Sequence, residues 1–382
     1  MKKTLLIPVI LMVSLLSGCL IYLPENAGGR PVYTERNVEP VYREETPVVI
    51  SMSFIFDYLS GHGYWVRHHR YGYVWVPRGV PRHWRPYTYG RWVWTEYGWT
   101  WFSYFDWGWL TFHYGRWGWE ARLGWFWVPD TVWGPAWVIW RVGDIYVGWA
   151  PLPPEVEFIT GYGLRWKKHE LPHYYWIFIE ARRFSASRIL DWVIPPERNL
   201  TIINFTVVRD RISFKNKIII NDALTPDEIE RLSRRPVTKV KLQEIKQPEP
   251  ERLSYSEMKI YKPEIKPEQA APKSVLSEEE AAPRIKIEKE QVRSAAELER
   301  IHRKEAELLE QTQRLELENI RKKLDEETRS LPPQERQKEV EAKLQELRKK
   351  HEEEKEALLQ RQQAEKQEKG KVVKKENLRK KY

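Results

Sequence analysis

Hydrophobic residues follow two different periods along this chain. Between residues 51 and 154, aromatic residues alternate with polar residues and glycines, and this period of two is typical of β-strands with one buried face. From residue 294 to residue 370, apolar residues instead recur at steps of three and four among Glu, Lys, Arg and Gln, which predicts α-helices. The expected fold is therefore β plus α: a small antiparallel β domain followed by long, charged, coiled-coil-like helices.

The β block contains an internal repeat. Its phrase is Tyr-Gly-x-Trp-x-Trp, and seventeen of the twenty tryptophans of the chain lie in this block. Tyr89–Trp94 and Gly98–Ser103 read as two strands joined by a turn, and the pattern returns about 25 residues later, at Tyr114. A single hairpin is only marginally stable, whereas joined hairpins bury a shared core. Residues 51–154 are therefore predicted to form three hairpin repeats.

Residues 155–245 are predicted to be a strand-rich extension. The run Leu200–Val208 has the β-branched composition of a strand, and the runs 211–214 and 217–220 form a hairpin if Asn216 turns between them. Thr225 precedes a proline and two acidic residues, which is typical of a helix start with threonine as the N-cap.

The C-terminal third is predicted to be a linker followed by two helices. Residues 246–293 are rich in Pro, Lys and Glu with little periodicity, which indicates a disordered linker. The helices, 294–370, are divided at Pro332-Pro333, and Gly370 is expected to end the second helix. A helical hairpin, a two-stranded assembly and long single helices all fit, because the apolar seam is broken. The polar interruptions are Glu305, Thr312, His351 and Glu354.

The N-terminus is predicted to be a lipoprotein signal peptide, residues 1–18. Two lysines precede a short apolar run that ends in Leu16-Ser17-Gly18-Cys19. This phrase resembles the bacterial lipobox, and the resemblance implies removal of the leader and acylation of Cys19. An ordinary secretory signal and an uncleaved anchor are the alternatives. Residues 19–50 contain four prolines and are expected to form a tether, and Leu20 favours an outer-membrane lipoprotein that faces the periplasm.

Composition and charge narrow the choice of partners. Cys19 is the only cysteine, so no internal disulfide, thiolate nucleophile or cysteine-based metal site is expected. The formal net charge is +10, and residues 371–382 form a basic tail. Because an exported protein rarely meets nucleic acid, the expected anionic partner is lipid, lipopolysaccharide or wall polymer, and no nucleic acid is expected.

Three phrases of the β block carry a family resemblance. They are Phe54-Ile55-Phe56-Asp57-Tyr58-Leu59, Trp133-Gly134-Pro135-Ala136-Trp137 and Gly148-Trp149-Ala150-Pro151-Leu152. With them the chain resembles an uncharacterised bacterial envelope lipoprotein family that has Tyr-x-Trp-Gly-x-Trp-type repeats and is described as a domain of unknown function. This resemblance implies no activity.

Candidate binding residues come from the aromatic rings. Exposed Trp and Tyr rings bind sugars by stacking, whereas rings on one face of a sheet fill a core. Tryptophans at the expected loops are the candidates for ligand stacking: Trp107, Trp109, Trp133 and Trp137.

No catalytic, metal or cofactor site is predicted. No spacing singles out a pair for glycoside hydrolysis among five acids of the block, Glu96, Asp106, Glu120, Asp130 and Asp144. Four histidines that form a loose cluster in the block match no closed metal site, and two of them are expected to point to opposite faces of a strand because they are adjacent. These histidines are His62, His83 and the adjacent pair His68 and His69.

Two functions are carried forward. The first is a membrane-anchored lipoprotein with a structural or protein-interaction role, whose helices contact an envelope protein or associate with one another. The second is binding of peptidoglycan or exopolysaccharide through exposed Trp and Tyr. An envelope hydrolase that uses an acid of the repeat is a third hypothesis.

Overall fold

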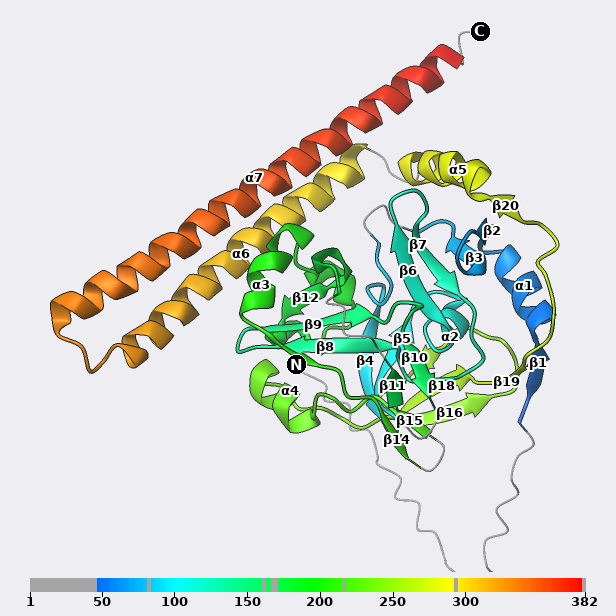
Figure 1. Ribbon diagram of the computed structural model, residues 1–382, viewed down its shortest axis with the longest axis horizontal. Coiled ribbons are helices and arrows are strands. Elements are labelled where there is room, and N and C mark those ends of the chain that lie inside the picture. Colours follow the sequence, from blue (N-terminus) through cyan, green and yellow to red (C-terminus); the bar gives the residue numbers. More distant parts are fainter. Residues whose placement is uncertain are drawn as a thin grey trace, which may run out of the picture. The chain divides into compact units, whose positions relative to one another are not determined.

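The structure, a computed structural model, describes residues 47–80, 84–159, 163–165, 171–215, 218–291 and 295–379. It shows a mixed α/β protein, with a Trp-rich region of β-hairpins and two long C-terminal helices that pack together (Figure 1). The predicted signal peptide 1–18, Cys19 and the tether as far as residue 46 lie outside the described residues, as do His83, Asn216 and residues 380–382. Within the described ranges, no helix combines the length and apolar character needed to cross a membrane.

The Trp-rich block forms four β-hairpins in the described residues, one more than predicted. Their strands are β2 (Gly63–His68) with β3 (Gly72–Pro77), β4 (Gly90–Thr95) with β5 (Gly98–Ser103), β6 (Arg116–Glu120) with β7 (Gly124–Val128), and β8 (Val138–Val142) with β9 (Tyr146–Pro151). The fourth hairpin lacks the Tyr-Gly phrase, but it places Trp140 opposite Trp149, just as the second places Trp92 opposite Trp101. Such cross-strand aromatic pairs stabilise hairpins.

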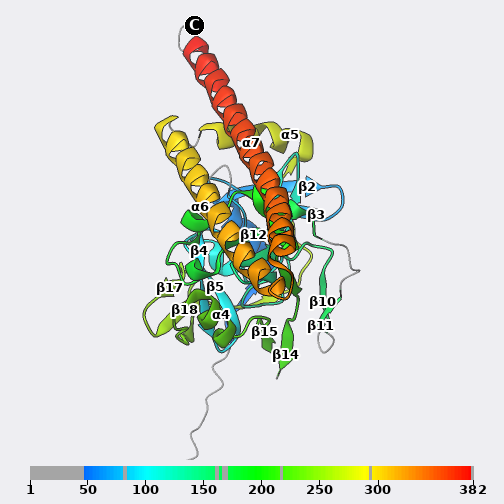
Figure 2. The same cartoon turned by 90° about the vertical axis from the view of Figure 1, so that its left-hand side faces the viewer.

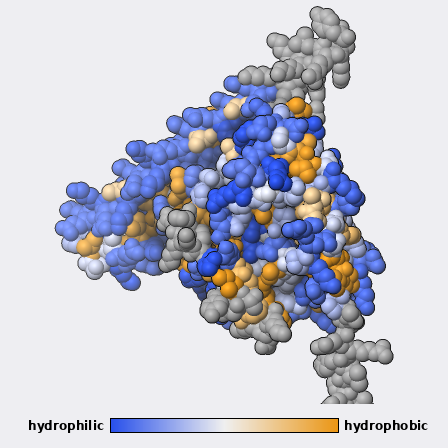
Figure 3. Space-filling model, turned by 45° about the vertical axis from the view of Figure 1, so that its right-hand side comes forward, coloured by the Kyte–Doolittle hydropathy of each residue, from blue (hydrophilic) through white to orange (hydrophobic). Residues whose placement is uncertain are grey.

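The hairpins belong to three sheets that share one core. β2–β3 and β6–β7 join a five-stranded sheet of order β20-β2-β3-β7-β6, β8–β9 lies at the centre of the order β12-β9-β8-β13, and β4–β5 forms a two-stranded sheet. Trp65, Trp101, Trp127 and Trp149 lie in one hydrophobic cluster and are at most 2% exposed. The face shown in Figure 3 is accordingly mostly hydrophilic, with smaller hydrophobic patches. The density of tryptophan is therefore largely explained by packing.

Backbone carbonyls satisfy many of the buried indole N–H groups. The indole of Trp75 donates to the carbonyl oxygen of Leu59 at 2.9 Å, and that of Trp127 donates to the carbonyl oxygen of Tyr114 at 2.8 Å. Leu59 belongs to α1 (Met52–Ser60), a helix inside the block that the repeat did not predict. Ser51 caps its N-terminus, and the buried side of α1 covers the tryptophans of β2 and β3.

The extension 155–245 contains short strands, 3₁₀ turns and helices. The elements are β10 (Glu157–Ile159), β11 (Gly163–Arg165), β12 (Ile177–Glu180), α3 (Asn199–Asn204), β13 (Val207–Arg209), β14 (Ser213–Lys215), β15 (Ile218–Ile220), α4 (Pro226–Ser233) and β16 (Lys241–Ile245), with 3₁₀ turns at His173–Tyr175, Ala181–Arg183, Ile189–Trp192 and Pro196–Arg198. The predicted pairing of β14 with β15 is found, and Thr225 caps α4 by accepting the backbone N–H of Glu228 at 3.2 Å.

The predicted strand Leu200–Val208 is wrong in its first half. α3 occupies that part, and only β13 is extended. Asn199 holds the first turn by donating to the carbonyl oxygen of Trp176 at 2.8 Å, and Ile202 is fully buried against the core. Tertiary packing therefore overrides the β propensity of this run.

The predicted disordered linker 246–293 is instead a strap packed against the β domain. Its elements are β17 (Arg252–Leu253), β18 (Glu257–Tyr261), β19 (Glu264–Lys266), β20 (Leu276–Ser277) and α5 (Glu278–Gln291). β18, β19 and β20 pair in parallel with β16, β1 (Val49–Ser51) and β2, respectively. Met258 and Ile260 are fully buried. A few apolar residues at alternate positions thus suffice to order a segment of polar composition.

The C-terminal helices α6 (Ala295–Glu327) and α7 (Pro333–Arg379) form a hairpin (Figure 2), which is one of the three arrangements that the broken seam allowed. Leu324, Val340 and Leu344 pack together near the turn, where Pro332 and Pro333 divide the helices as predicted. Gly370 does not end α7. An internal glycine costs only about 1 kcal/mol relative to alanine, and the surrounding Lys and Glu are good helix formers.

Candidate functional site

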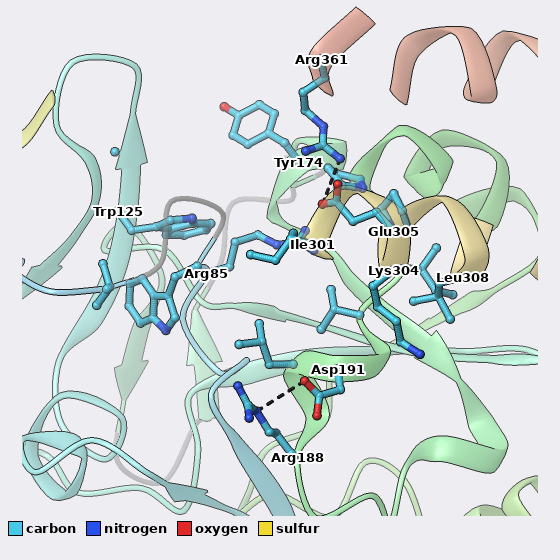
Figure 4. A pocket seen from close by; sticks show the side chains of 18 of the residues that line it. Arg85, Trp125, Tyr174, Arg188, Asp191, Ile301, Lys304, Glu305, Leu308 and Arg361 are labelled. Atoms are coloured by element: carbon cyan, nitrogen blue, oxygen red, sulfur yellow. Dashed lines mark ion pairs between the residues drawn. The ribbon is translucent and has the colours of Figure 1, made fainter. Parts of the chain in front are cut away.

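A pocket of about 470 Å³ lies between the β domain and the helical hairpin (Figure 4). Ligand sites typically have volumes of roughly 300–1,000 Å³. The pocket is formed by the ends of β3 and β7 with the segment after β3, by residues 188–196, and by side chains of α6 and α7. In Figure 4, Trp125 stands on one wall, and Ile301 and Leu308 of α6 stand on the wall opposite.

Aromatic side chains line one side of the pocket. Trp84 and Trp125 are buried, whereas Trp119 and Tyr174 are 36% and 37% exposed and have ring centroids 4.7 Å apart. The backbone N–H of Trp119 donates to the hydroxyl of Tyr175 at 3.0 Å, which fixes the edge of β6 beside Tyr174. The two exposed rings are tilted by 53° to each other, and each offers a face on which a ring or a planar group can stack.

Both carboxylates in the pocket wall already have cationic partners. Asp191 lies 3.4 Å from Arg188, and Glu305 lies 3.1 Å from Arg361 (Figure 4). Burial disfavours the charged form of Arg361, but Glu305 and other nearby carboxylates outweigh this effect and raise its pKa. These carboxylates are therefore not available to neutralise other charges in the pocket.

Three further cations of the wall lack a carboxylate partner. Among the residues that the structure describes, no carboxylate lies within ion-pair distance of Arg85, Arg300 or Lys304. Arg85 donates to the carbonyl oxygen of Trp176 at 2.6 Å, and Lys304 lies 4.9 Å from the ring centroid of Trp192. Burial lowers the pKa of Arg85 to about 10, so its guanidinium is still charged at neutral pH. The pocket wall consequently carries an excess of positive charge that favours an anion.

A buried ionic cluster centred on Arg198 joins the hairpin to the β domain. The Nη1 atom of Arg198 lies 3.1 Å from Oε2 of Glu354, its Nη2 atom lies 2.9 Å from the hydroxyl of Tyr146, and the guanidinium also pairs with Glu316. Nε2 of His351 lies 2.9 Å from Glu316. His351 and Glu354 are polar interruptions of the seam, so these interruptions mark the surface that meets the β domain.

The other interruptions of the seam also take part in docking. The carbonyl oxygen of Thr312 accepts from the Tyr146 hydroxyl at 3.3 Å, and Glu305 belongs to the ion-pair network of Arg361. Arg361 lies 2.5 Å from Glu197, which precedes Arg198 on the β domain. The hairpin that forms one wall of the pocket is therefore held by polar contacts.

The candidate ligand-stacking residues are mostly core residues. Trp107, Trp109 and Trp137 are at most 4% exposed, so the exposure on which their selection rested is not found. Trp107 and Trp109 belong to a short helix, α2 (Gly108–Thr111), and its N-cap, and Arg116 of β6 covers Trp137 at 3.5 Å from the ring centroid. Trp133 is half-buried and stacks on His113. Trp119 and Tyr174, which are exposed at the pocket, were not selected.

The acids of the Trp-rich block lie apart from the pocket. Within the described ranges, Asp106 and Asp144 are exposed at turns, Asp130 and Glu96 accept backbone N–H groups, and Glu120 faces His68. The structure brings no two of these five acids together at the pocket.

The adjacent histidines stack with ring centroids 4.5 Å apart, which contradicts the expected opposite orientation. β2 ends at His68, so His69 lies in a turn where strand alternation no longer applies. His68, His69 and Glu278 lie close enough to share a metal ion. However, Nδ1 of His68 accepts the backbone N–H of Arg70 at 3.1 Å, and its Nε2 faces Glu120. Hydrogen bonds therefore engage Nδ1 of both histidines, whereas Nε2 of His68 has no hydrogen-bond partner among the described residues.

Residues 56–156 match the model of a family of unknown function, DUF6600. The Trp-rich block thus contains a domain of unknown function, in agreement with the part of the resemblance that concerns this block. No curated protein and no solved structure is significantly similar to the chain.

Proposed function

We propose that the protein is a non-catalytic binding protein of the bacterial cell envelope. In this proposal, acyl chains on Cys19 hold it to the outer membrane, and the β domain with its docked hairpin faces the periplasm. The hairpin offers a long charged surface for an envelope protein or the wall. Self-association through the helices stays a prediction. Seam residues of α6 and α7 already pack against each other within one chain, so self-association would have to use another face of the helices.

The anchoring part rests on the Leu16-Ser17-Gly18-Cys19 phrase. When the full chain is expressed in a diderm bacterium with labelled palmitate, we expect the label in the protein and the protein in the outer-membrane fraction. Cys19→Ala should lose the label, because no other cysteine is present. A label that survives this substitution contradicts the proposal.

The binding part rests on one observation: the pocket carries three cations that have no carboxylate partner among the described residues, beside an exposed aromatic pair. We expect the purified protein to bind the apolar anion anilinonaphthalene sulfonate at a saturable site. Replacing both Arg300 and Lys304 with Gln should weaken this binding by roughly tenfold or more, since charge-assisted contacts are worth about 1.5–3 kcal/mol. Arg303→Gln is the matched control, because Arg303 is exposed on α6 but does not line the pocket. If the unsubstituted protein, the double variant and Arg303→Gln bind anilinonaphthalene sulfonate with equal affinity, the pocket is not the binding site.

Glycan binding is the second candidate, and the exposed pair Trp119 and Tyr174 favours it. Titration with peptidoglycan and polysaccharide fragments should then change the Trp fluorescence, and Trp119→Ala should remove that change. The variant tests the platform without opening the core, because the ring of Trp119 is partly exposed.

A further inference from the structure

Three cations of the pocket wall have no carboxylate partner among the described residues. Arg85 has the carbonyl oxygen of Trp176 as its acceptor, and no carboxylate of the described chain pairs with Arg300 or Lys304. The described lining contains no Ser, Thr, Asn or Gln side chain. A ligand must therefore supply acceptors and negative charge.

This donor set fits poorly to a neutral sugar. Each sugar hydroxyl donates as well as accepts, so it needs an acceptor from the wall. The carboxylates of Asp191 and Glu305 are already engaged by arginines. A neutral glycan can stack on the rim, but it leaves the positive charge of these cations unbalanced and therefore fits the pocket less well than an anion.

Most of the remaining wall is aliphatic. Val76 and Val80 come from the β domain, Val193 and Ile194 from the segment 188–196, and Ile301 and Leu308 from α6. Walls of this kind gain free energy by removing a flexible apolar chain from water, at about 0.8 kcal/mol for each methylene group.

We propose that the pocket binds an amphiphile with one anionic head, a carboxylate or a phosphate, and an apolar acyl or alkyl tail. The head binds at Arg300 and Lys304, which lie four residues apart on one face of α6, and the tail lies between the β domain and α6. This inference rests on the proposed function, in which the pocket is the binding site, and it specifies the chemical class of the ligand.

The test is a calorimetric titration of the purified protein with octyl, decyl and dodecyl phosphate below their micelle concentrations. Inorganic phosphate and decanol supply the head alone and the tail alone. Affinity should rise about fourfold for each added methylene group. Inorganic phosphate should not bind in the same concentration range, and decanol should bind at least tenfold more weakly than decyl phosphate.

Two variants separate head from tail. Arg300→Gln with Lys304→Gln should weaken all alkyl phosphates by a similar factor, whereas Arg303→Gln should not. Ile301→Trp places a large ring on the partly exposed face of α6 and should remove the dependence on chain length. Competition by phosphatidylglycerol vesicles would identify a membrane lipid as the source of the amphiphile, and competition by laurate alone would identify a free fatty acid.

The outcomes distinguish this inference from the proposed function. One outcome is that inorganic phosphate binds as tightly as dodecyl phosphate and that the Arg300 and Lys304 variant binds neither. The pocket then binds anions, but the inference that its ligand is an amphiphile is wrong. If an acidic oligosaccharide binds in the pocket and the alkyl phosphates do not, the amphiphile is also wrong. If neither anilinonaphthalene sulfonate nor any alkyl phosphate responds to these substitutions, both proposals fail.

Discussion

Replacing Arg198 with alanine is expected to lower the free energy of unfolding by about 3–5 kcal/mol and to loosen the helical hairpin. Arg198 is fully buried, and its partners Glu316 and Glu354 have side chains that are 1% and 5% exposed. Burial disfavours the charged form of Arg198, but Tyr146 and the two carboxylates outweigh this effect and raise its pKa. Removing the guanidinium leaves two carboxylates buried together without their cation, and this is the source of the loss.

Urea denaturation followed by Trp fluorescence measures the global effect, and hydrogen exchange of the α6 amides measures release of the hairpin. Arg188→Ala is the control, because Arg188 and Asp191 form a pair whose side chains are about half exposed, 52% and 49%. A pair of this kind contributes less than about 1 kcal/mol. If Arg198→Ala costs no more than this control and exchange in α6 is unchanged, the cluster does not hold the hairpin.

A compensated variant tests the reason for the loss. Arg198→Met combined with Glu316→Gln and Glu354→Gln removes the buried cation together with both buried carboxylates. The new glutamine amides can still form hydrogen bonds with His351 of α7 and Gln313 of α6. We expect this variant to regain much of the stability that Arg198→Ala loses, because the unpaired carboxylates, rather than the missing pair itself, carry most of the cost.

Local patterns predicted most of the hairpins and both helices. Alternation around Trp92 and Trp101 specifies strands, and Pro332-Pro333 specifies the division between α6 and α7, because both signals act over a few residues. The strap could not be predicted in this way. Its strands β19 and β20 pair in parallel with β1 and β2, which lie far away in the chain, so no local turn signal announces these pairings.

The sequence predicted the type of residue in the candidate site but not its position. Exposed tryptophan is the predicted chemistry of the site, but alternation does not say where a strand passes the edge of the core. Trp117 and Trp119 lie two residues apart on β6, yet the first is 1% exposed and the second 36%. The polar interruptions at His351 and Glu354 were visible as a broken seam. Their partner Arg198 lies more than a hundred residues away, so local reasoning could not supply it.

Replacing Glu251 with alanine is expected to cost about 3–5 kcal/mol and to release the strap that begins with β17. The carboxylate of Glu251 is fully buried, 3.0 Å from Nε2 of His113, and it also accepts the backbone N–H of Ser103 at 2.7 Å. Nδ1 of His113 lies 2.9 Å from the carbonyl oxygen of Gly134, so both ring nitrogens face oxygens. The substitution leaves Nε2 of the buried imidazole and the backbone N–H of Ser103 without partners.

Urea denaturation and limited proteolysis within residues 246–277 measure this effect, and Glu249→Ala is the matched control. Glu249 lies two residues away and pairs with Arg252 at 2.7 Å, but both side chains are largely solvated, so its loss should cost less than about 1 kcal/mol. Glu251→Gln keeps an acceptor for Ser103 and should fall between the two, because it loses the charge but not that hydrogen bond. If Glu251→Ala behaves like Glu249→Ala, the contact with His113 does not pin the strap, and the burial of Met258 and Ile260 alone must order it.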